Sequence, residues 1–186
     1  MKNLFKMRIL NVGCGNDTYG TDFLDLYPQR KEVKKCAIDS EKFPYSNNSF
    51  DEVRIYFVFE HLKNHEHVLK EIYRVLRRGG ILDLKTDNAS YWYYALDNKT
   101  HTGRYEFAPK YGKKDRHFGL FTDHHLINYF NDIGFKDIKI RPSYDNARGK
   151  NLNYRGKTVL IINFILTHIK PIKRMGFSEL QIKGKK

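Results

Sequence analysis

An amphipathic helix pattern lies between two apolar strand patterns in the middle of this chain. In the segment EHVLKEIYRVLRRGG the apolar residues recur at helical spacing, at Val68, Leu69, Ile72, Val75 and Leu76. The basic and glycine residues at positions 77–80 are expected to end the helix. Strand candidates lie on both sides, at residues 51–59 (DEVRIYFVF) and residues 81–85. A strand–helix–strand unit of this kind joins parallel strands, so the pattern limits the chain to folds with helices packed on a sheet.

Further elements are expected on both sides of this unit. Before it, three short apolar runs are predicted as strands, at residues 7–12, 23–26 and 36–38. After it, Thr122 is a favourable N-cap for a helix that ends before Gly134. Residues 135–141 and the apolar residues 158–168 are predicted as the last strands. The fold class that follows is an α/β sandwich with a mostly parallel sheet.

The length of 186 residues fits one domain, which we assign to residues 1–170. Residues 87–119 are polar and aromatic with weak periodicity, and they are predicted to form a lid over a substrate. Residues 167–186 contain six Lys or Arg residues and one Glu. We therefore expect residues 171–186 to be an exposed basic tail.

The chain is strongly basic. It has 34 Lys and Arg residues against 21 Asp and Glu residues, a formal net charge of +13. Such an excess attracts RNA, acidic membrane surfaces or phosphorylated substrates without choosing among them. Two cysteines do not suffice for a disulfide framework or for a zinc site built from cysteines. The longest apolar run, residues 159–166, is too short to span a membrane, and a cytoplasmic protein is expected.

Candidate ligand-binding residues follow the first three predicted strands. Gly13 and Gly15 form a turn in which the backbone can approach a ligand, although Thr18 stands where a dinucleotide fingerprint needs glycine. Asp25 and Asp39 end the next two strands. Because the carboxyl ends of parallel strands meet at one edge of a sheet, these positions are expected to face one nucleoside-sized ligand.

Several segments in this order resemble a known family. LNVGCGND, LDLYP, IDSEKFPYSNNSFDEV, FVFEHL and LKEIYRVLRRGG are similar to the motifs of class I S-adenosylmethionine-dependent methyltransferases, in particular the small type 11 subgroup. The resemblance covers residues 8–85 and continues loosely through HFGLFTDHHLINYFNDIGF. It implies a Rossmann-like sandwich of seven strands with an antiparallel last strand, and S-adenosylmethionine as cofactor.

The resemblance also implies roles for individual residues. The glycine turn would pass under the methionine and sugar of the cofactor, Asp25 would bind the ribose hydroxyls, and Asp39 would meet the adenine amino group. Tyr56 and Phe57 would line the methyl-transfer site. The full set of implied cofactor contacts is Gly13, Cys14, Gly15, Asn16, Asp25, Leu26, Asp39, Ser40, Tyr56 and Phe57.

Two departures from the family pattern concern the surroundings of the cofactor. Nine residues separate Gly15 from Asp25, too few for a full helix, so the first crossover is predicted to be short. The first motif begins at residue 8, so the N-terminal helical cap of many relatives is expected to be absent. The acceptor is therefore expected to be held by residues 87–119 or by a partner chain, including a second copy.

His61 and His117 are the candidate catalytic bases, because both are expected near the acceptor. An alternative is that Glu60 and His61 order the loop before the helix. The histidines of HLKNHEH have zinc-like spacing, but helix periodicity explains that segment and no metal site is predicted.

Three functions fit these observations. The first is a methyltransferase for a small or medium-sized acceptor. The second is an RNA methyltransferase that uses the aromatic and basic residues of segment 87–119, although the tetrapeptide typical of amino-directed nucleic-acid enzymes is absent after the fourth strand. The third is a non-catalytic, cofactor-binding subunit of a complex.

Overall fold

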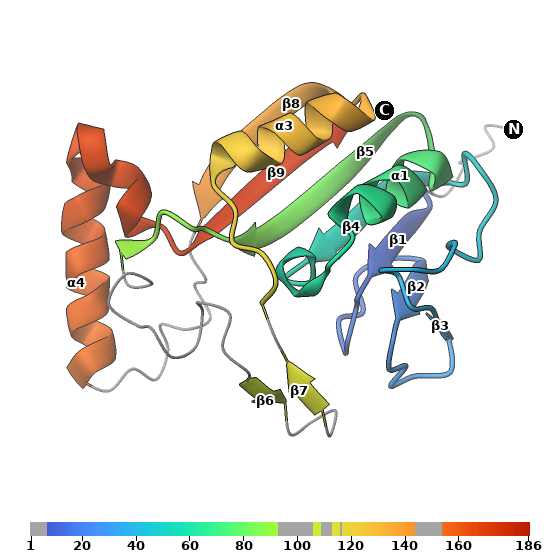
Figure 1. Cartoon of the computed structure of the whole chain (residues 1–186), viewed down its shortest axis with the longest axis horizontal. Helices are drawn as coiled ribbons and strands as arrows, with labels where there is room; N and C mark the ends of the chain where they lie inside the picture. Colours follow the sequence, from blue (N-terminus) through green and yellow to red (C-terminus); the bar gives the residue numbers. More distant parts are fainter. Residues whose placement is uncertain (1–6, 93–105, 109–112, 116, 144–153) are drawn as a thin grey trace, which may run out of the picture.

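The computed structural model describes residues 7–92, 106–108, 113–115, 117–143 and 154–186. It has a central sheet of seven strands in the order β3-β2-β1-β4-β5-β9-β8 (Figure 1). The strands of this sheet are β1 (Ile9–Val12), β2 (Asp22–Asp25), β3 (Val33–Lys35), β4 (Phe50–Tyr56), β5 (Leu76–Asp87), β8 (Lys136–Ser143) and β9 (Glu179–Lys185). A separate pair consists of β6 (Glu106–Ala108) and β7 (Lys113–Asp115). The helices are η1 (Phe59–His61), α1 (His65–Val75), α3 (Asp123–Ile133), α4 (Tyr154–His168) and η4 (Lys170–Gly176).

The predicted fold class is confirmed. The pairs β1–β2, β2–β3, β1–β4 and β4–β5 are parallel. β9 lies antiparallel between β5 and β8, as expected for the last strand. The first crossover is also short, because no helix lies between β1 and β2, both of which fall in the described residues 7–92.

The core lies on one face of the sheet, where α1 and α3 pack (Figure 1). α1 buries Val68, Leu69, Ile72 and Val75, the residues that define its amphipathic pattern. Alternate residues of β4, Val53 and Ile55, face this core. The residues between them therefore point to the opposite face, because side chains alternate along a strand. That face carries polar side chains, among them Glu52, Arg54, Asp83 and Gln181.

The end of α1 differs from the prediction. The helix ends at Val75, and Leu76 already has extended backbone angles and pairs with Phe50 of β4. Residues 77–80 thus belong to β5 instead of closing the helix. Gly80 makes this possible, because a Cβ atom there would lie 2.9 Å from the carbonyl oxygen of Arg77 and 3.1 Å from that of Phe50.

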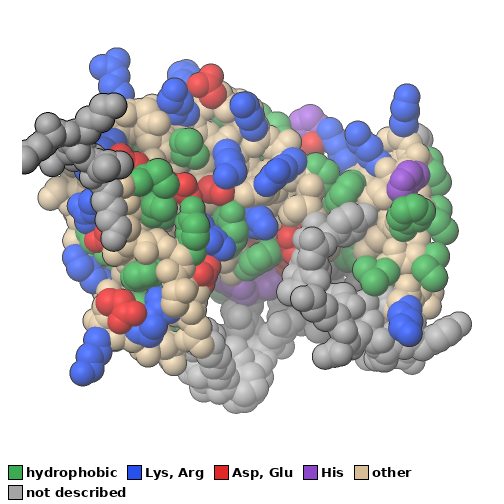
Figure 2. All heavy atoms as spheres, turned by 180° about the vertical axis from the view of Figure 1, so that it is seen from behind, with side chains coloured by type: hydrophobic (Ala, Val, Ile, Leu, Met, Phe, Trp, Pro, Cys, Tyr) green, Lys and Arg blue, Asp and Glu red, His purple; other side chains and the backbone are tan. Residues whose placement is uncertain are grey.

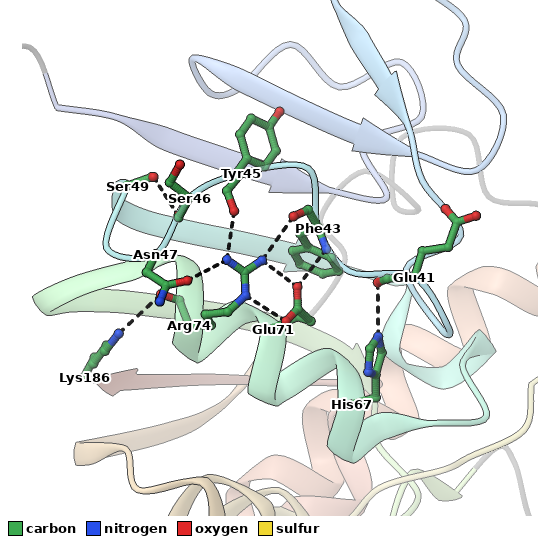
Figure 3. Close-up of polar contacts among 10 residues, drawn as sticks. All are labelled: Glu41, Phe43, Tyr45, Ser46, Asn47, Ser49, His67, Glu71, Arg74 and Lys186. Atoms are coloured by element: carbon green, nitrogen blue, oxygen red, sulfur yellow. Dashed lines mark hydrogen bonds and ion pairs between the residues drawn. The ribbon is translucent and has the colours of Figure 1, made fainter.

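The connection between β3 and β4 is held against α1 by hydrogen bonds to an ion pair of that helix (Figure 3). Glu71 accepts a hydrogen bond from the backbone N–H of Phe43 at 2.7 Å and pairs with Arg74 at 2.6 Å. Arg74 donates in turn to the carbonyl oxygens of Tyr45 and Phe43, at 2.8 and 3.1 Å. Phe43 is thereby held in the core, where it is 1% exposed. The predicted third strand is shifted, since residues 33–35 form β3 and residues 36–38 follow it.

The prediction for α3 and β8 is confirmed. The Thr122 side chain accepts from the backbone N–H of His125, whose ring accepts from that of Thr122, which makes a capping box. The helix ends at Gly134, whose φ of 102° is left-handed. This is a conformation that glycine adopts without a steric cost.

Two predictions for the C-terminal part are wrong. Residues 158–168 belong to the helix α4, not to a strand, because a short apolar run does not by itself distinguish the two. Residues 179–185 form β9 inside the sheet, where Leu180 and Ile182 are buried, so residues 171–186 are not an exposed tail. Among the described residues, no helix is both long and apolar enough to cross a membrane. Of the predicted lid, residues 93–105, 109–112 and 116 lie outside the described residues.

Candidate functional site

The glycine turn after β1 is shaped by contacts that exclude a side chain. Gly13 and Gly15 have φ angles of 66° and 50°. The backbone N–H groups of Gly13 and Cys14 donate to the carbonyl oxygen of Leu24 in β2, at 2.8 and 3.2 Å. A Cβ atom on Gly13 would lie 2.3 Å from Cγ2 of Val58. Only glycine fits there, because the backbone angle and the neighbouring side chain both exclude a larger residue.

Asp25 joins this turn to the end of β2. Its Oδ2 accepts a hydrogen bond from the backbone N–H of Gly15 at 2.8 Å, and its Oδ1 accepts from Tyr27 N–H at 2.8 Å. A carboxylate has about four lone-pair positions, so these two bonds leave acceptor capacity on both oxygens. The predicted convergence of the glycine turn and Asp25 at one edge of the sheet is therefore present.

Asp39 is oriented toward the start of α1. Its carboxylate accepts from the backbone N–H groups of Lys63, at 3.0 and 3.1 Å, and of Asn64, at 2.7 Å. The side chain of Asn64 then caps α1 by accepting from His67 N–H. Ser40 is exposed, and its backbone N–H donates to the Ala37 carbonyl oxygen. Asp39, which follows β3, thus links this edge of the sheet to the junction of η1 and α1.

The two aromatic residues at the end of β4 differ in their surroundings. The Tyr56 hydroxyl donates to Oδ2 of Asp83 at 2.9 Å and accepts from Gln181 at 2.9 Å, on the polar face of the sheet. Burial, and then the negative charge of Asp83, raise the pKa of the Tyr56 hydroxyl. Phe57 is 38% exposed and has a φ of 55°. A bulky residue in that left-handed conformation stores strain of about 1–3 kcal/mol, and such strain is common at functional sites.

The remaining predicted cofactor contacts differ in exposure. Asn16 and Leu26 are exposed at the sheet edge, while Cys14 is buried. Burial, and to a smaller extent the negative charge of Asp25, raise the pKa of the Cys14 thiol to about 11. The thiol is therefore protonated at neutral pH and has little nucleophilic character.

The two histidines predicted as catalytic bases lie together. The rings of His61, in η1, and His117 have their centroids 4.6 Å apart in an edge-on arrangement. Nδ1 of His117 lies 3.5 Å from Oδ2 of Asp87, at the end of β5, and these side chains are 10% and 7% exposed. Residues far apart in the sequence thus form one group of proton-binding side chains at the carboxyl ends of β4 and β5.

The buried residue Glu60 contacts the segments that carry this group. Glu60 is 2% exposed, and its Oε2 accepts a hydrogen bond from the Thr86 hydroxyl at 2.9 Å. Its carbonyl oxygen accepts from the backbone N–H groups of Phe118 and Gly119, at 2.7 and 3.1 Å. Glu60 thus ties η1 to β5 and positions the segment that carries His117, while the alternative that Glu60 and His61 order the loop before α1 stays a prediction.

Asp87 is the site residue that sequence reasoning missed. Its position directly after an apolar strand was the available signal, because strand ends supply most of the residues at this edge. The other histidines of HLKNHEH are directed elsewhere. His65 Nε2 contacts the Phe59 carbonyl oxygen at 3.0 Å, and His67 Nε2 contacts that of Glu41 at 3.1 Å. In the described part of the chain, no group of three or more potential ligands could hold a metal ion.

A family model described as a methyltransferase domain matches residues 10–84 of this chain. A demethylmenaquinone methyltransferase from Geobacillus kaustophilus is 26% identical over 167 residues, which cover 77% of this chain and 70% of the relative. One of the same name from Lactobacillus johnsonii is 36% identical over 80 residues, 37% of this chain and 33% of that relative.

Solved structures with the same fold are also methyltransferases. A SAM-dependent methyltransferase from Archaeoglobus fulgidus has a TM-score of 0.63 at 17% identity, covering 97% of this chain and 86% of that chain. An S-adenosylmethionine-dependent methyltransferase from Mesorhizobium loti has a TM-score of 0.60 at 13% identity, covering 97% and 91%. At these identities the structural likeness shows the fold, while the match over residues 10–84 supplies the sequence relation.

Proposed function

We propose that this S-adenosylmethionine-dependent methyltransferase acts on a small molecule at an atom that loses a proton, with His117 as the base. The observation that carries the proposal is the group of His61, His117 and Asp87 at the carboxyl ends of β4 and β5. The relatives named as demethylmenaquinone methyltransferases support a small acceptor. We therefore take demethylmenaquinone as the first acceptor to test.

The residues around the glycine turn fit the cofactor. Gly13 and Gly15 expose backbone in left-handed conformations that let a ligand lie close to the chain. Asp25 keeps acceptor capacity for the two ribose hydroxyls while it holds Gly15 in place. Asp39 remains the proposed contact for adenine, and it would share its oxygens with the N–H groups of Lys63 and Asn64. The proposed contact from Tyr56 is limited to its ring, because its hydroxyl bonds to Asp83.

S-adenosylmethionine supplies an activated sulfonium methyl group, so the protein has to orient the acceptor and remove one proton. The acceptor atom forms a bond to the methyl carbon while the carbon–sulfur bond breaks, with its electron pair left on sulfur. The acceptor proton passes to His117, and we assign this transfer to Nε2 because Nδ1 faces Asp87. Asp87 is a positioning residue whose negative charge stabilises the imidazolium that forms. A positioned base contributes about 10²–10⁴-fold to the rate.

The first experiment tests the cofactor site by isothermal titration with S-adenosylhomocysteine. Asp25→Asn should weaken binding, since it removes the charged acceptor of the glycine turn. Asp22→Asn is the matched control, because Asp22 lies at the other end of β2 and pairs with Arg8. Equal affinity of wild type and Asp25→Asn would contradict the assignment of the cofactor site.

The second experiment measures methyl transfer from labelled S-adenosylmethionine to demethylmenaquinone in its reduced form. His117→Gln should lower kcat about 10²-fold or more and leave S-adenosylhomocysteine binding unchanged. Asp87→Asn should also lower kcat and should shift the pH dependence of the rate. An unchanged kcat in His117→Gln would refute the proposed base. Methylation of RNA, without methylation of small acceptors, would refute the proposed acceptor class.

A further inference from the structure

The helix α4 exposes an apolar surface beside the sheet. Figure 2 shows hydrophobic side chains gathered over this helix, with Lys and Arg side chains above and below them. Ile161, Phe164 and Ile165 are 60%, 65% and 52% exposed. The apolar residues with large exposure on α4 and the segment that follows it are Leu160, Ile161, Phe164, Ile165, Ile169 and Met175. A contiguous apolar surface of this kind marks an interaction site.

This surface is held in place by polar contacts. Asn163, on the inner side of α4, accepts a hydrogen bond from Trp92 Nε1 at 2.6 Å and donates to the Tyr91 hydroxyl at 3.2 Å. The following segment η4 is tied to the end of β5, because the Asn88 side chain donates to the carbonyl oxygens of Arg174 and Phe177, at 3.0 and 2.8 Å. The exposed residues are thus presented outward by a built structure next to the carboxyl edge of the sheet.

The charged side chains of α4 and η4 themselves are all basic. Between Asp145 and Glu179 the sequence has no acidic residue. Lys157, Lys170 and Lys173 are exposed. Arg174 is paired with Asp123 at 2.8 Å, so the lysines are the charges that this surface offers to a ligand.

We propose that α4 and η4 dock on an anionic lipid surface, with the apolar residues in the interface and the lysines against the lipid headgroups. At 15 residues, α4 is about 22 Å long, which is shorter than the hydrocarbon core of about 30 Å, so it would lie along the lipid surface. A second copy of the chain fits less well, because a symmetric contact would bring the lysines of both copies together. RNA also fits less well, because base stacking needs aromatic rings and most of the exposed residues are aliphatic.

The proposal goes beyond the proposed function and does not depend on its acceptor. Asn88, which anchors η4, directly follows Asp87 of the candidate catalytic group. A docked molecule would therefore hold the edge of the sheet with this group close to the lipid surface.

Vesicle flotation of the full chain tests the proposal, with phosphatidylcholine alone and with phosphatidylcholine mixed with phosphatidylglycerol. We expect binding to the mixed vesicles that weakens as salt is added. Lys170→Gln combined with Lys173→Gln should weaken it about 25-fold, at about fivefold for each lysine. Ile161→Gln combined with Phe164→Gln should weaken it about tenfold or more for each residue.

Matched controls lie on the sheet. Lys136→Gln with Lys139→Gln changes two exposed lysines of β8, and Ile81→Gln changes an isoleucine that is 41% exposed. These variants should bind as wild type does. All variants should keep S-adenosylhomocysteine affinity and the fluorescence of Trp92, the only tryptophan in the sequence, which reports an intact contact with Asn163.

Three results would overturn the proposal. The first is absence of binding to the mixed vesicles, and the second is equal binding by the α4 variants and wild type. The third is a wild-type dimer that Ile161→Gln with Phe164→Gln converts to a monomer, which would assign the surface to a second copy. Because the cofactor titration is independent of the vesicles, failure of this proposal is distinguishable from failure of the proposed function.

Discussion

Arg74→Ala should lower the stability of the protein more than the replacement of any exposed charged residue on the same helix. The guanidinium is 18% exposed, contacts Glu71 at 2.8 and 2.6 Å, and donates to two carbonyl oxygens of the β3–β4 connection. Removing one partner of a buried ion pair costs about 3–5 kcal/mol, because the other charge is left without compensation. Since both side chains keep some solvent contact, we expect a loss of about 3 kcal/mol in the free energy of unfolding.

Equilibrium denaturation in urea measures this loss. The matched control is Lys70→Ala, which breaks an exposed pair with Glu66 on the same helix, where the side chains are 65% and 64% exposed, and should have no measurable effect. The Arg74 hydrogen bond is the largest cause of the lowered Glu71 pKa. The stabilisation is therefore present above the usual glutamate pKa of 4.5 and is lost as the pH falls below it. A loss below about 1 kcal/mol, or an equal loss in the control, would refute the reasoning.

Three further predictions concern single residues. Burial raises the thiol pKa of Cys14 and Cys36 to about 11, so native alkylation by iodoacetamide at pH 8 should be about 100-fold slower than in urea; comparable rates would contradict this. Burial lowers the pKa of His65, so the unfolded chain binds more protons and stability should fall as the pH drops below 6.5. His65→Gln should flatten that slope in denaturation midpoints. Phe57→Gly should be about 1 kcal/mol more stable than Phe57→Ala, because glycine tolerates the φ of 55°; the reverse order would indicate an unstrained backbone.

The elements that could be predicted from the sequence are those whose signals are local. The glycine turn, the amphipathic pattern of α1 and the Thr122 cap each fix an element from a few neighbouring residues. The proposed cofactor contacts Gly13 and Asp25 were predicted in the same way, from their positions at strand ends. The orientation of the Tyr56 hydroxyl could not be predicted from neighbouring residues, because it depends on hydrogen bonds to Asp83 and Gln181 in two other strands.

The C-terminal half was harder because its elements are defined by distant contacts. The run of residues 159–166 is apolar on consecutive positions, a pattern that fits a buried strand as well as a helix. The contact of Asn163 with Trp92 fixes the side of α4 that faces inward, and nothing near Asn163 in the sequence indicates that partner. Asp87 and His117 are likewise 30 residues apart, so their proximity follows only from the fold.

A buried carboxylate in β5 helps to position the C-terminal strand β9 in the sheet. Asp83 is 4% exposed in the middle of the sheet, and a buried carboxylate is stable only with partners. β9 supplies them, since Gln181 donates to Asp83 Oδ1 at 2.7 Å and Lys183 pairs with Oδ2 at 2.6 Å. Shifting β9 by one residue would turn these partners toward the core and Leu180 and Ile182 toward solvent. The positive charge of Lys183, one of those that suggested an exposed tail, therefore helps to fix the register of β9.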